Sequence, residues 1–297
     1  MYQIIARNKL ISLHIMVIIL GFTGVLGKLI TLDTSYLVWY RMLIACIVLF
    51  IFMLFKNTVR KIKIKNIIPL LGIGSIVALH WLFFFEAIKV SNISIAVICL
   101  STSSLFSSFL EPIFFKRRIL TYEVLFGLAV LLTLYFMLNE TPKITNNTNY
   151  IYGYIYGIIS ALLATLFTLM NAKYISKIDA VEITMFEMLG GVLTISLLFL
   201  INNDYTIINQ QININDIIYL IILATICTAG VFVWMIEIMR YITPYSLIMA
   251  VNLEPIYSVI IALIIFNESE TMNLSFYLGG AIILCIVFLD GYIKNKQ

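Results

Sequence analysis

Long apolar runs separated by short polar segments make up almost the whole chain. A run of about 20 apolar residues is long enough to cross a bilayer as a helix. The pattern predicts about ten such helices, and no segment between them is long or polar enough for a separate soluble domain. We expect these helices near residues 10–30, 36–55, 67–88, 92–115, 121–138, 151–173, 180–201, 215–238, 243–266 and 273–291. The expected fold class is therefore an all-α polytopic membrane protein.

Composition agrees with this prediction and excludes several kinds of protein. Hydrophobic residues make up 62% of the chain and charged residues 11%, whereas soluble domains carry about 25% charged residues. The net charge of +4 is too small to indicate a nucleic-acid partner. The four cysteines lie in apolar runs without metal-site spacing, and no nucleotide-binding or hydrolase motif occurs. We expect no metal, no cofactor, no nucleic-acid partner and no enzymatic activity.

The basic residues predict how the chain lies in the membrane. With the N-terminus inside, 15 of the 19 basic residues fall on the cytoplasmic side, as the positive-inside rule requires. Both termini are then cytoplasmic, and the first apolar run is a retained span because no small-residue cleavage site follows it. The two longest connections, 139–150 and 202–215, are expected to be mobile surface loops.

The chain contains an internal repeat. The run FEAIKV from Phe85 aligns with IEIMRY from Ile236, which places Glu86 opposite Glu237 and Lys89 opposite Arg240. Upstream, YRMLIA from Tyr40 matches FEMLGG. We expect two five-helix repeats, residues 1–140 and 150–297. Five spans is an odd number, so the second repeat is inverted, and transporters with inverted repeats bind substrate at the repeat interface near mid-depth around a central cavity.

Glu254 and Pro255 lie together in the middle of the apolar run 243–266. A carboxylate at mid-depth costs about 2.5 kcal/mol or more, so it usually faces the protein interior or a watery cavity. Pro255 lacks the N–H that would bond the carbonyl of Val251, which predicts a helix bend. Glu254 is thus the first candidate for substrate binding or proton coupling. The alternative is a buried acid that only joins two helices by a hydrogen bond.

Other polar residues fall at similar depth. His80 and Trp81 lie in the third span, where His80 is either a hydrogen-bonded core residue or part of a pocket. Ser101, Ser104 and Ser108 share one helix stripe, which is either a cavity wall or a packing seam. The remaining candidates for the wall of the cavity are Asn252 and Tyr257.

Arg41 and Glu187 occupy matching positions in the two repeats, but we do not expect them to touch. Counted from their own membrane faces, they lie about 10 Å apart in depth. Arg41 is expected either to extend outward to the interface or to bind an anionic group. Glu187 shares a close-packing face with Gly190, Gly191 and Thr194. Further helix contacts are expected at Gly21, Gly24, Gly27, Gly153 and Gly157.

Three more acids lie nearer the ends of their spans. Glu86 and Glu237 are candidates either for gates or for simple anchors beside a basic neighbour. Glu111 is expected to be a solvated residue at a helix end.

Taken together, GVLGK at 24–28, WYRMLIA at 39–45, EAIKVSNISIAVICLSTSSLF at 86–106 and NLEPIYSVIIALIIFNE at 252–268 resemble the EamA type of the drug/metabolite transporter superfamily. The resemblance implies a basket of ten helices around a central cavity that carries amino acids, metabolites or toxic compounds across the cytoplasmic membrane. By position it extends to Arg41, Glu254, Pro255 and Glu268. The first repeat departs from the family pattern because Ser104 stands where a proline is common, so we expect no symmetric pair of bent helices.

We therefore predict a secondary transporter of small organic solutes that exposes a mid-depth cavity to each side in turn. Its partners are a small-molecule substrate, the lipid bilayer and, as a hypothesis, a coupled proton carried by Glu254, with His80 as the second choice. The alternatives are an intramembrane lipid-modifying enzyme, a lipid or sugar flippase, and a scaffold or sensor that transports nothing.

Overall fold

The computed structural model describes residues 9–56, 64–140, 144–145, 148–203, 212–266 and 272–295. Eight helical segments among them are long and apolar enough to cross a membrane, and the shorter apolar helices Thr121–Met137 and Leu274–Ile286 bring the total to the predicted ten. The first repeat contains α2 (Lys9–Leu29), α3 (Thr34–Phe55), α4 (Ile64–Val90), α5 (Ile93–Cys99), the 3₁₀ turn η1 (Leu100–Thr102), α6 (Ser103–Phe115) and α7 (Thr121–Glu140).

The second repeat contains the counterparts of these elements in the same order. They are α8 (Tyr150–Asn171), α9 (Ala180–Ile201), α10 (Ile214–Ala224), the π-helical turn η3 (Thr225–Gly230), α11 (Val231–Ile238), α12 (Pro244–Val251), α13 (Glu254–Phe266) and α14 (Leu274–Asn295). The connection at 139–150, expected to be a mobile surface loop, contains a short antiparallel pair, β1 (Ile144–Thr145) and β2 (Thr148–Asn149). Most of the second long connection lies outside the described residues.

Several helices begin at a side chain that caps them. Asn92 accepts the amide of Ile95 at 2.9 Å, and Asp179 accepts that of Val181 at 3.0 Å. Thr243 caps α12 in the same way and is followed by a proline. Such caps satisfy N–H groups that have no partner inside the helix, which matters most where the bilayer offers none.

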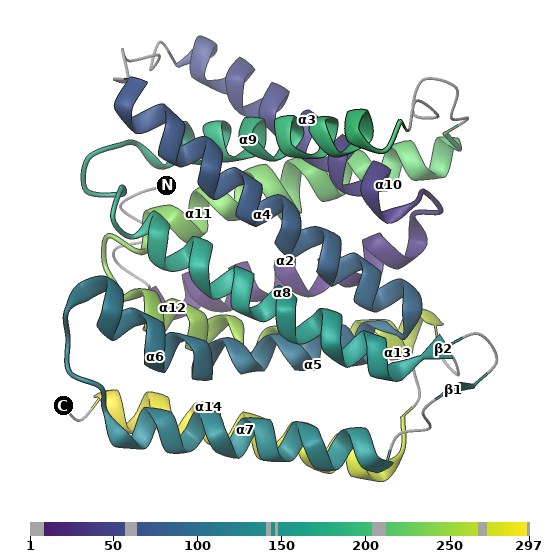
Figure 1. Cartoon of the computed structure of the whole chain (residues 1–297), viewed down its shortest axis with the longest axis vertical. Coiled ribbons are helices and arrows are strands. Elements are labelled where there is room, and N and C mark those ends of the chain that lie inside the picture. Colours follow the sequence, from purple (N-terminus) through teal and green to yellow (C-terminus); the bar gives the residue numbers. More distant parts are fainter. Residues whose placement is uncertain are drawn as a thin grey trace.

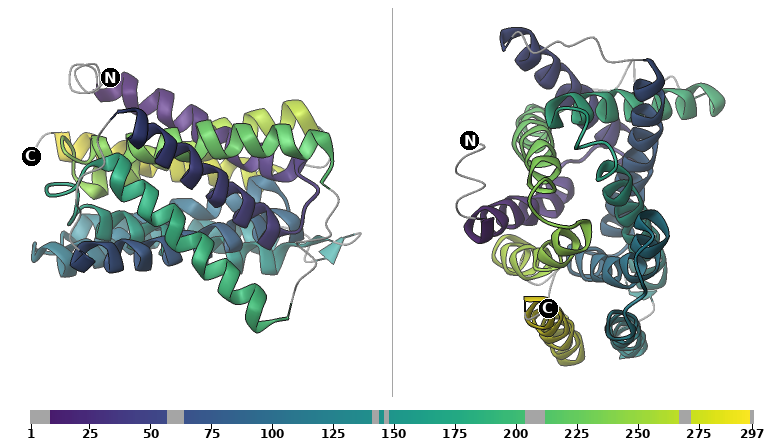
Figure 2. Two further views of the ribbon diagram at one scale, coloured as in Figure 1. Left: turned by 90° about the horizontal axis from the view of Figure 1, so that it is seen from above. Right: turned by 90° about the vertical axis from the view of Figure 1, so that its left-hand side faces the viewer.

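The two repeats interlock rather than lying side by side (Figure 1). The first helix of each repeat packs against the interrupted helix of the other repeat: α2 against α13, and α8 against α5 and α6. The last helices, α7 and α14, pack together at one edge of the bundle (Figure 2). α2 begins and α14 ends at the same end of the bundle, as an even number of spans requires (Figure 1). This arrangement surrounds the middle of the molecule with helices from both repeats.

Both repeats have an interrupted fourth span, which corrects the expectation of asymmetry. In the second repeat the helix stops at Val251 and restarts at Glu254, at the predicted Glu-Pro position. In the first repeat the 3₁₀ turn η1 stands at the equivalent place although no proline is present. Hydroxyls there donate to carbonyls three residues back: Thr102 to Cys99 at 2.7 Å, Ser104 to Ser101 at 2.8 Å, and Ser103 to Leu100. Local bonds of this kind compete with the helix ladder, so side-chain hydroxyls accompany the break where a proline is absent.

An ion-pair cluster closes the corner between α6 and α7. Arg117 Nη2 lies 2.9 Å from the Glu111 carboxylate and 2.7 Å from that of Glu123. Glu111 is 5% exposed, so the expectation of a solvated helix end was wrong. Burial by itself lowers the pKa of Arg117, but its hydrogen bonds to Glu123 and Glu111 more than compensate and raise that pKa above its usual value. The guanidinium therefore stays charged at this corner.

Glycines set the closest helix crossing, between α4 and α9. A Cβ added to Gly74 would lie 2.0 Å from the carbonyl oxygen of Glu187, and one added to Gly190 would lie 2.2 Å from that of Leu71. The hydroxyl of Thr194 donates to Ser75 at 2.7 Å across the same crossing. The predicted close-packing face of α9 is thus confirmed, as are the predicted contact points on α2 and α8, where added Cβ atoms would press on neighbouring helices.

We expect Gly74→Ala to destabilise the protein by about 1–3 kcal/mol, the usual cost of overpacking, because the α4 and α9 backbones must separate. The matched control is Gly72→Ala, since a Cβ there meets nothing within 4 Å. Both substitutions raise helix propensity by the same amount. A difference in stability between the two variants therefore measures the effect of the α4–α9 contact alone. Thermal unfolding of the detergent-purified variants measures it, and equal melting temperatures would contradict this account.

Candidate functional site

A central cavity lies between the two repeats, with about 70 Å³ available to the centres of water-sized molecules. That is enough room for several waters or part of a small ligand. Its walls come from seven spans, four of the first repeat and three of the second, and are mostly apolar. Its lining residues are Leu20, Thr23, Arg41, His80, Trp81, Phe84, Leu100, Ser103, Ala164, Thr165, Phe167, Thr168, Phe232, Met235, Leu247, Ile248, Val251 and Glu254.

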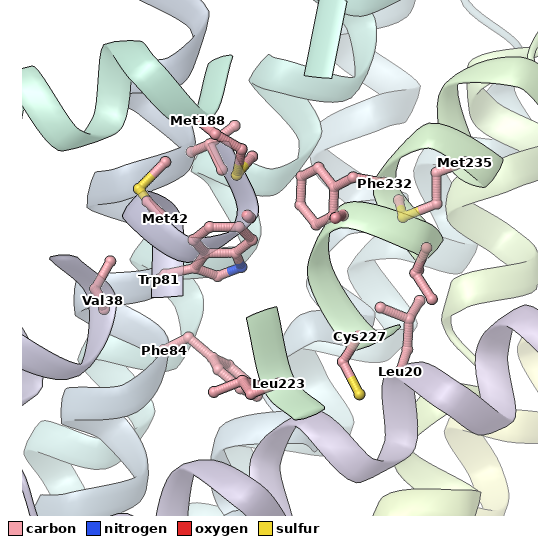
Figure 3. Close-up of a cluster of buried hydrophobic side chains, with 14 of the residues drawn as sticks. Leu20, Val38, Met42, Trp81, Phe84, Met188, Leu223, Cys227, Phe232 and Met235 are labelled. Atoms are coloured by element: carbon pink, nitrogen blue, oxygen red, sulfur yellow. The ribbon is translucent and has the colours of Figure 1, made fainter. Parts of the chain in front are cut away.

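Part of the wall is built from equivalent positions of the two repeats. In the register that pairs Glu86 with Glu237, four lining residues of the first repeat stand opposite four of the second. The pairs are Trp81 with Phe232, Phe84 with Met235, Leu100 with Val251, and Ser103 with Glu254. Trp81 and Phe232 meet edge to face with ring centroids 5.0 Å apart (Figure 3). The cavity therefore lies where the pseudo-two-fold relation between the repeats brings their equivalent helices together.

Arg41 from α3 turns inward and is 1% exposed. Its guanidinium carbon lies 3.7 Å from the centroid of the Trp81 ring, and its Nε donates to the hydroxyl of Thr228 at 2.6 Å. Nη1 is buried without a hydrogen-bond partner. Of the two roles expected for Arg41, extension to the interface is therefore wrong, and the side chain lies where an anionic group could reach it.

Glu254 borders the same cavity at the first residue of α13. It is 5% exposed, and its carboxylate accepts no hydrogen bond from the residues that the structure describes. The alternative of an acid that only joins two helices by a hydrogen bond thus finds no donor there. Glu254 interacts electrostatically with Arg41, so the cavity holds one acid and one base that influence each other.

His80 combines the two roles considered for it. Its Nδ1 lies 2.9 Å from the Ser160 carbonyl and 2.8 Å from the Ser160 hydroxyl, while that hydroxyl donates to the His80 carbonyl at 3.1 Å. This pattern fits a proton on Nδ1 that is donated to α8, which leaves Nε2 as the acceptor. The ring also packs 5.5 Å from Phe167 and borders the cavity. His80 is therefore both a hydrogen-bonded core residue and a wall residue.

The structure brings four of the candidate residues together, namely Arg41, His80, Trp81 and Glu254, and leaves four elsewhere. Ser101 and Ser104 are buried in helix contacts outside the cavity wall. Asn252 is 1% exposed in the turn before α13, and the Tyr257 hydroxyl faces His14 at 3.4 Å.

Sequence reasoning did not identify Ser103 as a wall residue. It could have done so, because Ser103 occupies the position in the first repeat that is equivalent to Glu254. It also missed Thr23, Thr165 and Thr168, which line the wall from α2 and α8. Threonines are common at ordinary helix contacts, so no residue pattern marked these three.

The remaining charged candidates lie outside the cavity wall. Glu187 is buried at the α4–α9 crossing and does not meet Arg41, as its depth predicted. Glu86 accepts a hydrogen bond from Thr34 at 2.7 Å, and Glu237 pairs with Arg240 at 3.0 Å. Both acids are anchored. Glu268 lies outside the described residues.

Comparison with known proteins agrees with this architecture. One solved structure, titled "Crystal structure of protein", is 13% identical, covers 96% of both chains and superposes with a TM-score of 0.67. That likeness shows the fold alone. No curated protein matches the chain. The profile of the EamA-like transporter family matches residues 8–139 and again 151–290, which is nearly the whole chain in two copies. The chain belongs to the EamA-like transporter family.

Proposed function

We propose that this protein moves small organic solutes across the cytoplasmic membrane by exposing the central cavity to each side in turn. The observation that carries the proposal is the wall of that cavity, to which two inverted repeats contribute four pairs of equivalent positions. Inverted repeats provide two conformations of similar energy, related by exchange of the repeats' roles. The cavity also gathers Arg41, Glu254 and His80 at the break between α12 and α13, as a polar solute requires.

We further propose that both termini face the cytoplasm. Basic residues support this orientation, because Arg117, Lys173 and Arg240 belong to the connections that lie at the same end of the bundle as the start of α2. Lys89 and the β1–β2 pair then lie at the outer end.

Two equivalent hydrogen bonds hold the two ends of the bundle. At the end of α4, the Lys89 ammonium donates to the carbonyl of Leu32, just before α3. At the end of α11, Arg240 Nη2 donates to the carbonyl of Ile178, just before α9, at 3.3 Å. We call these the Lys89 clasp and the Arg240 clasp.

The donors Lys89 and Arg240 occupy equivalent positions in the two repeats, and so do the acceptors Leu32 and Ile178. α4 and α11 end at opposite ends of the bundle (Figure 1). We propose that each clasp opens when its own side of the cavity opens. Each would then contribute to closing one side only.

Glu254 is proposed as the group that binds the solute or a coupled proton. It is the acid on the cavity wall, and its carboxylate has no described hydrogen-bond donor. A proton or a cationic part of a solute can occupy that position without displacing a protein contact.

Glu254→Gln is expected to lower transport by about tenfold or more, equal to about 1.4 kcal/mol, because the amide keeps the shape but loses the charge and the exchangeable proton. Uptake of labelled amino acids and other metabolites into proteoliposomes, with and without an imposed pH gradient, measures it.

The matched control is Glu187→Gln, which changes a buried acid outside the cavity wall and should preserve transport. Equal rates for the native protein and Glu254→Gln would remove Glu254 from the mechanism. The transport proposal itself fails if the native protein moves no solute of the panel and no lipid.

The clasps predict opposite effects on access to the cavity. With the four native cysteines replaced and Thr23→Cys placed in the wall, Lys89→Gln should speed labelling by a membrane-impermeant maleimide from outside. Arg240→Gln should speed labelling from the cytoplasmic side. Losing the hydrogen bond of a clasp, about 0.5–1.5 kcal/mol, shifts the equilibrium by about two- to tenfold, and Arg240→Gln also loses the ion pair with Glu237.

The control for this experiment is Lys28→Gln, which removes another basic side chain near the Lys89 end that belongs to neither clasp. It should leave both labelling rates unchanged. If Lys89→Gln and Arg240→Gln speed labelling from the same side, or neither alters it, the clasps have no role in gating.

A further inference from the structure

The central cavity contains a positive charge that no protein carboxylate neutralises directly. Arg41 forms no ion pair with any described acid, and its one hydrogen bond, through Nε, goes to a neutral hydroxyl. Nη1 is buried and unpartnered. A buried charge whose counter-charge and hydrogen bonds are incomplete is costly, so a ligand that supplies the missing ones completes the site.

The guanidinium is held in a fixed orientation. One face lies over Trp81 at 3.7 Å, and Phe85 lies further off at 5.5 Å. Thr228 fixes the Nε edge. Because one face is stacked on a ring and Nε is hydrogen-bonded, the Nη groups are the part of the guanidinium that can bind a ligand. Their planar arrangement of donors is suited to a planar oxyanion.

The hydroxyl of Thr228 is itself oriented by an irregular helix. It donates to the carbonyl of Leu223, five residues back, at 2.7 Å, inside the π-helical turn η3. Because its proton is used in that bond, the oxygen is an acceptor toward Arg41. Single π-turns often occur at functional sites, and this one presents an acceptor at the α3 side of the cavity.

The rest of the wall limits the ligand's size and charge. Arg41 is the only Lys or Arg on it among the described residues, and most of the other lining residues are apolar or aromatic. A doubly charged phosphate would keep an unpaired negative charge there, whereas a carboxylate matches a single guanidinium.

We propose that Arg41 binds the carboxylate of a small substrate with an apolar body, and that Thr228 positions Arg41 for this purpose. The proposal rests on the transport function and names the substrate class for the same cavity. Glu254 then distinguishes two kinds of carboxylate ligand. A simple carboxylic acid makes no contact with Glu254, whereas a zwitterion places its ammonium group beside the Glu254 carboxylate.

The test is calorimetric binding to the purified full chain with three six-carbon probes: hexanoate, hexylamine and norleucine. Native protein should bind hexanoate or norleucine, and Arg41→Gln should weaken that binding by about tenfold or more while sparing any hexylamine binding. Arg41→Lys keeps the charge but loses the fork, so it should restore binding only in part. Glu254→Gln should weaken norleucine and spare hexanoate.

Thr228→Val and Thr228→Ser form the matched pair that keeps the test decisive if Arg41→Gln fails to fold. Thr228→Val should weaken carboxylate binding alone, and Thr228→Ser, which keeps the hydroxyl, should restore it. A merely structural role for Thr228 would affect hexylamine and carboxylates alike, which would overturn its positioning role.

The carboxylate proposal is overturned if native protein binds neither carboxylate probe, or if Arg41→Gln binds them as well as native protein does. Binding is measured without transport, so it fails separately from the proposed function. A protein that transports a solute independently of Arg41 refutes the carboxylate site only, and one that binds carboxylates but transports nothing refutes the transport proposal only.

Discussion

A bilayer offers no hydrogen bonds, so every backbone polar group placed at mid-depth must find its partner within the protein or in an enclosed cavity. The interrupted helices depend on this constraint. At η1 the hydroxyls of Thr102, Ser103 and Ser104 bond back to the carbonyls of their own turn. At the second break, Pro255 has no N–H to satisfy, and the turn before it is closed by amides that bond three or four residues back. The cavity lies between these two breaks, since breaks are tolerated only where protein or enclosed water covers them.

The frame of the cavity is symmetric, but its chemistry is not. Trp81 and Phe232 are equivalent, as are Leu100 and Val251, and these pairs form the apolar wall. The charged positions differ between the repeats. Ser103 is the first-repeat equivalent of Glu254. The second-repeat equivalent of Arg41 is Glu187, which is buried at another helix crossing. In the transport cycle proposed above, a symmetric frame would give two conformations of similar energy, and the asymmetric side chains would form one ligand site that both conformations share.

The position of the Arg41 side chain is decided by packing and not by its charge. An arginine six residues inside a span can reach the interface with its long side chain. Here the ring of Trp81 and the hydroxyl of Thr228 hold it in the interior instead. The three residues come from α3, α4 and η3, so the site exists only once spans of both repeats have packed. Close glycine contacts such as Gly74 against α9 bring these spans near enough.

The sequence by itself determined the ten spans, the inverted duplication, the break at Glu254-Pro255 and the glycine contact faces. These features follow from hydrophobic length, residue spacing and the missing N–H of proline, which are local properties. The tertiary structure decided which polar side chains share the cavity. Helical spacing placed Ser101 and Ser104 on one stripe and left open whether that stripe was a cavity wall or a packing seam. In the structure Leu100 and Ser103 line the cavity instead, because the packing of the neighbouring helices decides which face of this span meets the cavity. Likewise, only the packing of three separate elements turned Arg41 inward, because periodicity defines the face of a helix but not the neighbour that the face will meet.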